Sequence, residues 1–161
     1  MPTPDPMAAF GMGPMDDPED TERTANLREG AKRYSDIAEK GRGAASTMAH
    51  LKAAAAWERA QDTEAQLAAL QKAYESGGKG VLGWSAASQL AAAKVAAEDI
   101  DGAAAVLIEV NQSASGIIAE QALLNLGLIY ETAGRTDDAT RTLEDFTLSL
   151  IHISEPTRQP C

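Results

Sequence analysis

The sequence predicts an all-α protein of about seven helices. Apolar residues recur every three or four positions, as at Leu27, Ala31, Tyr34 and Ile37, and this is the spacing of one helix face. No segment shows the sustained apolar and polar alternation of a half-buried strand, and no proline occurs between positions 19 and 155. Alanine occupies many apolar positions while aromatic residues make up only 4% of the chain, so we expect helices packed at short axial separation.

Capping residues and glycine-containing breaks divide the chain into these helices. We expect residues 1–17, which are rich in proline, methionine and glycine, to form a disordered leader. Asp17 is suited to cap the first helix, Thr63 begins a segment with capping-box spacing, and Thr136 precedes two aspartates that favour a helix start. The expected helices span residues 18–39, 45–61, 63–76, 83–97, 100–112, 116–133 and 136–147.

Composition limits the function classes that the chain can have. Its formal net charge of −10 repels nucleic acid and anionic membrane surfaces, so we expect it to bind neither. No stretch approaches the roughly 20 apolar residues that span a bilayer, so we expect no membrane insertion. Cys161 and His152 lie near the C-terminus, which leaves His50 as the one histidine of the helical region. No Glu-x-x-His pair surrounds His50, so we interpret it as an ordinary helix residue and expect no metal and no cofactor.

We expect the last fourteen residues to have a different origin from the rest of the chain. Residues 148–158 resemble one reading frame of the transposon adaptor used to build short-read sequencing libraries, and the agreement extends over eleven consecutive residues. Residues 148–161 are therefore expected to be an adaptor-derived artefact, with the natural sequence breaking off near Thr147. Whether Met1 is the true start stays open. A hairpin cut at this point is expected to expose apolar surface.

Residues 123–146 carry the most informative pattern of the chain. Gly134 separates two expected helices, and Gly127 on the first and Ala139 on the second are small where the helices of a hairpin approach closely. The segment resembles a tetratricopeptide repeat, whose packing positions are occupied here by Leu123, Leu126, Gly127, Tyr130, Ala139, Leu143 and Phe146. Phe146 departs from the family pattern, which has a small residue there.

The pattern recurs earlier in the chain at slightly more than the family's usual period of about 34 residues. Leu143, Leu107, Leu70 and Tyr34 follow one another at spacings of 36 and 37 residues, each on an expected second helix. Trp57 falls on the position that the repeat gives to tyrosine, where we expect packing rather than ligand binding. Each hairpin then buries its apolar face only against its neighbours, which predicts a curved stack rather than a globule.

The resemblance implies a tetratricopeptide-like solenoid, a right-handed superhelical stack of about three and a half hairpins over residues 18–147. Such repeats are non-catalytic scaffolds that bind a protein or peptide on a concave face lined by the first helices. The contact candidates on that face are Lys52, Gln89, Lys94, Asn125 and Glu131. The chain looks most like degenerate repeats of bacterial envelope proteins, which implies the cell envelope or periplasm if an N-terminal anchor has been lost. Partner identity, total repeat number and oligomeric state stay open.

An alternative keeps the same fold but changes its role. The helices would then be an accessory domain of a larger enzyme or envelope assembly factor whose functional part lies outside this chain, because solenoids often flank catalytic domains.

Three short patterns suggest other chemistry but have a simpler structural interpretation. Residues 78–83 satisfy the G-x-G-x-x-G pattern of dinucleotide-binding loops, yet a helix rather than a strand is expected before them, so we expect a loop between hairpins. Asp99 and Asp101 offer two oxygen ligands of a calcium loop but lack a third acid, which favours helix capping. Trp84 and Ser85 half resemble a nucleophile elbow that lacks its closing glycine.

Overall fold

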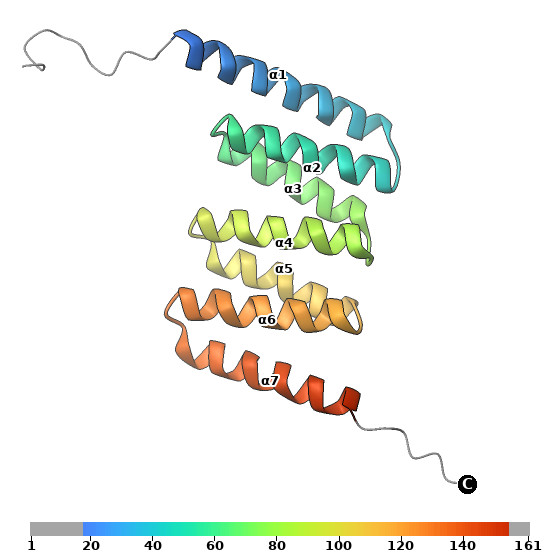
Figure 1. Ribbon diagram of the computed structural model, residues 1–161, viewed down its shortest axis with the longest axis vertical. Coiled ribbons are helices and arrows are strands. Elements are labelled where there is room, and N and C mark those ends of the chain that lie inside the picture. Colours follow the sequence, from blue (N-terminus) through green and yellow to red (C-terminus); the bar gives the residue numbers. More distant parts are fainter. Residues whose placement is uncertain (1–17, 155–161) are drawn as a thin grey trace, which may run out of the picture.

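The computed structural model describes residues 18–154, and over this range the chain forms seven α-helices and no strand (Figure 1). The expected leader over residues 1–17 lies outside the described residues. Six of the seven helices begin and end within about three residues of the bounds expected from the sequence. The helices are α1 Pro18–Lys40, α2 Ala44–Arg59, α3 Thr63–Gly77, α4 Val81–Ala96, α5 Ile100–Ser113, α6 Ile117–Thr132 and α7 Thr136–Ser154.

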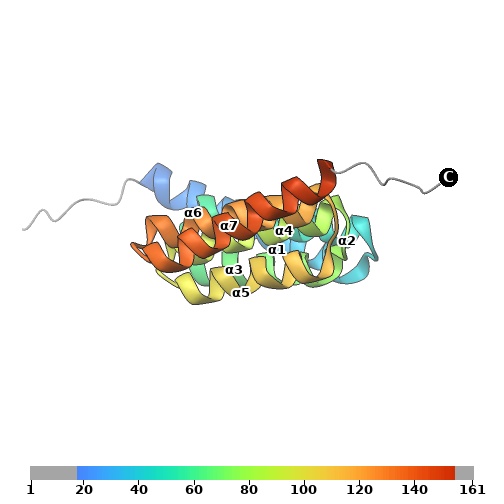
Figure 2. The ribbon, with the colours of Figure 1, turned by 90° about the horizontal axis from the view of Figure 1, so that it is seen from below.

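The helices form a stack of hairpins in which each helix packs against the next one along the chain. In addition α2 contacts α4, and α4 contacts α6, so these three helices form one layer that we call the inner layer. Figure 1 looks onto the inner layer, with α3 and α5 behind it. Figure 2 shows the same division from below, with α3 and α5 together on one side, and we call these two helices the outer layer.

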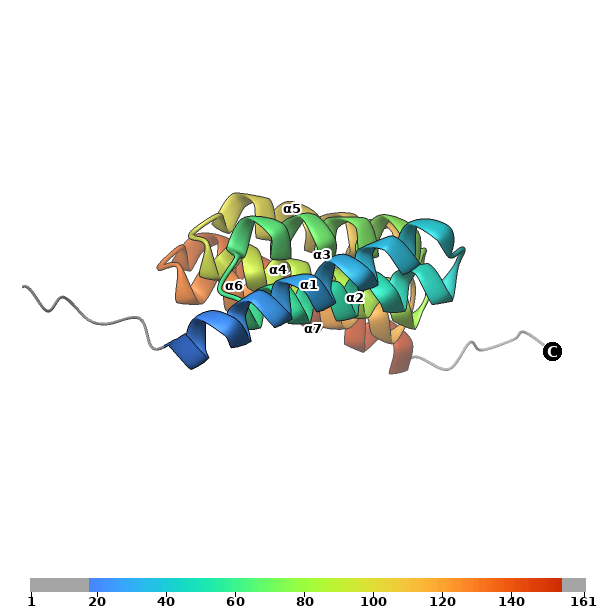
Figure 3. The ribbon, with the colours of Figure 1, turned by 90° about the horizontal axis from the view of Figure 1, so that it is seen from above.

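The two end helices are tilted relative to the layers. Figures 2 and 3 show that the N-terminal end of α1 and the C-terminal end of α7 both project past the inner layer, on the side away from α3 and α5. Each of these helices has its main contacts with a single neighbour, α1 with α2 and α7 with α6. The exposed side of the inner layer is therefore bordered at both ends of the stack by a projecting helix.

Small residues make up most of the core. Of the buried apolar residues over the described range, most are alanines, and the largest fully buried apolar side chains are Leu70, Leu90 and Leu107. Leu70 on α3 and Leu107 on α5 occupy the repeat position identified from the sequence, and both are at most 2% exposed. Alanine-lined helix surfaces allow close axial approach, so the dense packing of small side chains replaces the large aromatic core of other folds.

The first expected copy of the repeat does not pack as its spacing suggested. Tyr34 and Ile37 are 38% and 58% exposed, whereas α1 buries Ala31 and Ala38 against α2. The repeat position on an internal helix is covered by neighbours on both sides. Over the described residues α1 has a substantial contact with only one helix, so the side of α1 that carries Tyr34 and Ile37 stays open.

The connections between helices correct two further expectations. Asp62 rather than Thr63 caps α3, because the Ala65 N–H donates to Asp62 Oδ1 at 3.1 Å. Asp99 caps α5 in the way the sequence suggested, accepting the Gly102 N–H at 2.9 Å. At the other end, α7 continues to Ser154 instead of ending near Thr147, because apolar residues of 148–154 continue its helical spacing.

Candidate binding surface

The exposed side of the inner layer has few charges and several apolar side chains. Helix α4 carries a single charged residue in its 16 positions, and α6 carries only two, both glutamates. We call this exposed side the inner face. It comprises Met48, Lys52 and Ala55 of α2, Gln89 and Ala92 of α4, and Gln121, Leu124, Leu128 and Glu131 of α6.

Helix α6 contributes the most apolar part of the inner face. Leu124 is 36% exposed and Leu128, one turn later on the same side of the helix, is 48% exposed. The repeat spacing places Leu128 level with Ala92 of α4 and Ala55 of α2, which are exposed but small. These two alanines, which we call the alanine floor, and the two leucines make this part of the inner face apolar, and such a surface suits an apolar group.

The five contact residues expected from the sequence have different surroundings. Lys52 is exposed and its Nζ lies 5.7 Å from the centre of the Tyr34 ring. Gln89 is exposed and donates to the backbone and side-chain oxygens of Ser85, its neighbour one turn earlier. Asn125 is half-buried, and Glu131 is exposed near the end of α6.

Lys94, expected to contact a partner, is engaged in an ion pair within the chain. Its Nζ lies 2.8 Å from Asp99 Oδ2, and its side chain is mostly buried at the turn between α4 and α5. The ion pair with Lys94, together with the Gly102 N–H, lowers the pKa of Asp99. Lys94 thus stabilises the α4–α5 hairpin rather than extending a charge over the inner face.

The expected repeat-packing residues meet at the junction of α6 and α7. Leu126, Gly127, Tyr130 and Ala139 are buried, while Leu123, Leu143 and Phe146 are half-buried. A Cβ on Gly127 would lie 2.7 Å from Leu143 Cδ2, so the absence of a side chain there is what allows the two helices to approach.

Arg135 joins three helices at the same junction, although no sequence pattern singled it out. Its guanidinium lies 4.6 Å from the centre of the Tyr130 ring on α6 and 2.7 Å from Asp138 Oδ2 on α7, and it also pairs with Asp101 on α5. Hydrogen bonds to these two carboxylates raise the pKa of Arg135. The partner at Asp101 is 34 positions away, so no local pattern could have revealed this contact.

His50 lies inside α2 and is buried. It is 6% exposed between α1, α2 and α3, and its Nδ1 makes no hydrogen bond to the described part of the chain. An exposed ion pair between Lys72 of α3 and Glu39 of α1, 3.4 Å apart, joins the helices on either side of α2. Burial lowers the pKa of His50, the positive charge of Lys72 lowers it further, and Glu39 opposes them.

Two hydrogen bonds near the start of α2 join the same three helices. The Ser46 hydroxyl donates to the Ala38 carbonyl oxygen at 2.8 Å, and the hydroxyl oxygens of Thr47 and Ser76 lie 3.0 Å apart. The polar groups at the start of α2 therefore act as structural contacts rather than as part of an exposed site.

Of the glycines in residues 78–83, Gly83 allows close packing, whereas a Cβ at Gly78 or Gly80 would meet nothing within 4 Å. This segment connects α3 to α4, as expected, and a Cβ on Gly83 would overlap the Gly78 carbonyl group. Beside it is a crevice of about 240 Å³ lined by Tyr74, Trp84 and Glu109, among others. Burial, and to a lesser degree the charge of Glu109, raises the pKa of Tyr74 to about 12. A helix precedes this loop, so it lacks the strand that a dinucleotide-binding turn requires.

Residues 18–154 carry neither a cluster of metal ligands nor a membrane-spanning helix. No group of three or more histidine, cysteine, aspartate or glutamate side chains in this range is placed to hold a metal ion. None of its helices combines the length and the apolar character needed to cross a membrane.

Comparison with known proteins bears on the fold alone. No family model matches the sequence, and no curated protein matches it. Among solved structures, the fold is similar to that of BtubC (BKLC) from P. vanneervenii, with a TM-score of 0.58 and 15% sequence identity. The similarity covers 89% of this chain and 64% of the BtubC chain, so the matched part is less than two thirds of the length of BtubC. An all-helical stack of consecutive hairpins is therefore an arrangement that a solved protein adopts.

Proposed function

We propose that this chain is a tetratricopeptide-like scaffold that binds a protein or peptide segment on its inner face and does not itself catalyse a reaction. The observation that carries the proposal is the exposed side of α6, where Ile117, Leu124 and Leu128 lie on one side of the helix. In the isolated stack Leu124 and Leu128 leave 36% and 48% of their surface exposed. A partner that covers them gains roughly 1 kcal/mol for each half-exposed leucine, taking about 25 cal/mol per Å² of apolar area.

The surroundings of these leucines favour a mostly apolar ligand with a polar backbone. Gln89 and Gln121 are uncharged and exposed beside the alanine floor, and amide groups both donate to and accept from a peptide backbone. Charged residues are concentrated on α1 and α7 instead. A partner with one apolar side and few charges therefore loses little solvation energy when it lies on the inner face.

Selection of peptides against the full chain tests the proposal. A random peptide library displayed on phage is selected on the wild-type chain, and each recovered peptide is synthesised and titrated against two variants. Leu124→Asp with Leu128→Asp places two charges on the inner face, and we expect affinities to fall at least about tenfold, or about 1.4 kcal/mol.

The control is Ile108→Asp on α5, which puts one aspartate in the outer layer in place of an isoleucine that is 38% exposed. It is expected to leave the affinities unchanged, and circular dichroism checks that all variants stay folded. Peptides that bind the Leu124 and Leu128 variant as tightly as the wild type, or a library that yields no specific peptide, would contradict the proposal.

A further inference from the structure

The crevice of about 240 Å³ beside residues 78–83 lies between the two layers, at the edge of the stack where α3 leads into α4 and α5 leads into α6. Figure 1 shows these two connections at the same edge. Tyr74 lines the crevice from the last turn of α3, Trp84 from the first turn of α4 and Glu109 from the C-terminal half of α5. None of its lining residues belongs to the inner face, so the crevice is a separate surface.

Two aromatic side chains form walls of the crevice. Trp84 and Tyr74 are half-buried, and both pack against the core cluster that contains Leu70 and Leu90. Packing therefore holds the two rings in place, while part of each remains at the crevice. Neither of the two contacts between a cation and a ring within residues 18–154 involves Trp84 or Tyr74. The negative faces of these rings are thus not occupied by a cation of the described chain.

Two carboxylates line the same crevice, and neither makes an ion pair within the described residues. Burial, then the charge of Glu109 and its hydrogen bond with the Tyr74 hydroxyl, raises the pKa of Tyr74 to about 12. Tyr74 is therefore uncharged at neutral pH and leaves the charge of Glu109 uncompensated. The second carboxylate, that of Glu75, accepts a hydrogen bond from the uncharged amide of Gln71 at 2.9 Å.

The opposing charges at the crevice are fewer. Lys79 also lines it, but this lysine is exposed in the glycine-rich turn after α3 and pairs with neither carboxylate. Lys72, one turn before Glu75, already pairs with Glu39. The helix ends offset one another, because α3 and α5 end at the crevice while α4 and α6 begin there. Two carboxylates against one ammonium leave the crevice with a negative balance.

Aromatic walls beside an uncompensated carboxylate favour one class of ligand. An apolar group would cover Glu109 without giving it a partner, and an anion would be repelled, whereas a cation interacts favourably with the ring faces and with the carboxylate. Among cations, a guanidinium is planar, stacks on an indole, and binds a carboxylate through two parallel hydrogen bonds. A volume of about 240 Å³ is below the roughly 300–1,000 Å³ of small-molecule pockets and suits a single side chain.

We propose that this crevice is a second binding site, which receives one arginine side chain of a partner protein. The guanidinium lies against the Trp84 indole and donates to the Glu109 carboxylate, and the Tyr74 hydroxyl helps to hold that carboxylate in position. The aliphatic part of the arginine packs on Val110 and Ile118, which line the crevice from α5 and α6. The site does not depend on the inner face and applies whether or not that face binds a partner.

Nuclear magnetic resonance of the full chain tests the proposal, because the chain has two tryptophans and only Trp84 lines the crevice. The probe is a glycine–arginine–glycine tripeptide that is acetylated and amidated at its ends. It is titrated into nitrogen-15-labelled protein while the two indole N–H signals are followed, and Trp84→Phe assigns them. We expect the Trp84 signal to move and to saturate in the millimolar range, as one side chain allows, while the Trp57 signal stays in place.

Matched substitutions identify the groups that bind the guanidinium. Glu109→Gln keeps the shape but removes the charge, and we expect it to weaken binding at least about fivefold. The control is Glu144→Gln, the same exchange at an exposed residue of α7, a helix that packs mainly against α6, and it should change binding less than about twofold. Lys79→Ala should tighten binding because it removes the competing cation, whereas Arg42→Ala, at an exposed cation in the turn before α2, should not.

Other tripeptides test the chemistry of the ligand. Citrulline is an uncharged analogue of arginine, so its tripeptide should leave the Trp84 signal in place, and an equal shift would overturn the cation site. Binding of the lysine tripeptide as tightly as the arginine one would overturn the assignment to a guanidinium. Free arginine brings its own carboxylate toward Glu75 and Glu109 and should bind more weakly, and tighter binding would identify a free amino acid as the ligand instead.

The remaining outcomes concern the site as a whole. Equal weakening by Glu109→Gln and Glu144→Gln would show general electrostatic attraction only. Movement of both indole signals, or of neither, would remove the site. The inner-face variant with Leu124→Asp and Leu128→Asp is expected to bind the arginine tripeptide like the wild type, so the two proposals fail separately, and loss of binding in that variant would contradict two independent sites.

Discussion

Substitution of Gly127 by alanine tests whether the α6–α7 junction is held by close helix approach. The new Cβ would lie 2.7 Å from Leu143 Cδ2 and 2.9 Å from Leu143 Cγ, whereas carbon atoms in contact normally stay about 3.5–4.0 Å apart. Relief of such overlap by side-chain and backbone shifts costs about 1–3 kcal/mol. Alanine also recovers about 1 kcal/mol of helix propensity relative to glycine. The net expectation is a loss of up to about 2 kcal/mol in the free energy of unfolding.

Gly30 provides the matched control on α1. It is also inside a helix, but a Cβ there would meet nothing within 4 Å. Gly30→Ala is therefore expected to raise the free energy of unfolding by about 0.5–1 kcal/mol through helix propensity alone. The difference between the two substitutions isolates the overlap at Leu143, because the propensity gain is common to both.

Urea unfolding followed by circular dichroism measures both variants, and a double-mutant cycle with Leu143→Ala identifies the partner. Once Leu143 is shortened the overlap is removed, so Gly127→Ala is expected to become stabilising in that background. If Gly127→Ala stabilises the natural background as much as Gly30→Ala does, the helices do not depend on close approach at Gly127 and the reasoning is refuted.

Two further predictions concern buried and capping residues. Burial holds the pKa of His50 below its ordinary value of 6.5, so as the pH falls through 6.5 the unfolded chain binds a proton that the folded chain does not. His50 should therefore lower the free energy of unfolding as the pH falls below 6.5, and should have no such effect above it. Urea unfolding at a series of pH values gives this free energy for the wild type and for His50→Gln. Its dependence on pH should be steeper for the wild type below pH 6.5, and an equal dependence would exclude His50 as the cause. Asp99→Ala should destabilise the fold more than Asp62→Ala, because both remove a helix cap but only Asp99 also pairs with Lys94. Thermal unfolding compares the two, and Asp99→Asn, which keeps the cap acceptor, should fall between Asp99→Ala and the wild type.

The fold was predictable because each level of the sequence agrees with the others. Helical spacing, glycine breaks and the recurrence of Leu70 and Leu107 all describe the same stack. The expected packing position was wrong on α1, where the repeat has a neighbouring helix on one side only. Sequence spacing treats every copy alike, whereas the burial of Tyr34 depends on a helix beyond α1 that the described chain does not provide.

The binding surface was less predictable because spacing identifies positions but not their surroundings. The equivalence of Lys52, Gln89 and Asn125 along the inner layer follows from the period, yet nothing local shows that Lys94 is engaged by Asp99. Leu124 and Leu128 were present in the pattern as apolar residues, and an apolar residue on a predicted helix is normally assigned to the core. Their exposure becomes visible only when the neighbours on both sides are in place.

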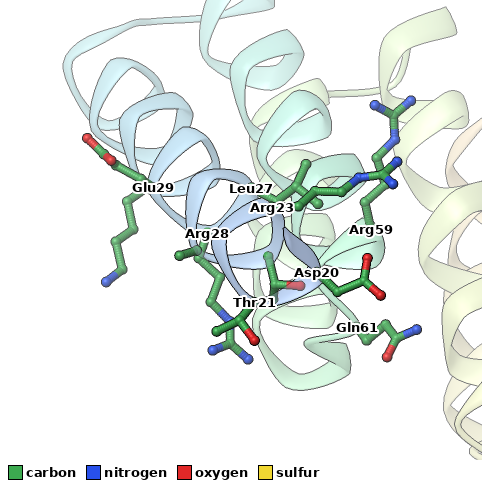
Figure 4. A pocket seen from close by; sticks show the side chains of 11 residues that line it. Asp20, Thr21, Arg23, Leu27, Arg28, Glu29, Arg59 and Gln61 are labelled. Atoms are coloured by element: carbon green, nitrogen blue, oxygen red, sulfur yellow. The ribbon is translucent and has the colours of Figure 1, made fainter. Parts of the chain in front are cut away.

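Electrostatic contacts show the same limit. A net charge is a sum over the chain, and it describes the field at distances greater than the spacing between charges. Within the chain, however, Lys72 of α3 pairs with Glu39 of α1, 33 positions away, and Arg135 pairs with Asp101, 34 positions away. Because α1 meets α2 in antiparallel contact, Arg23 near the start of one helix also approaches Arg59 at the end of the other (Figure 4). These approaches are consequences of topology, which neither the net charge nor a local pattern describes.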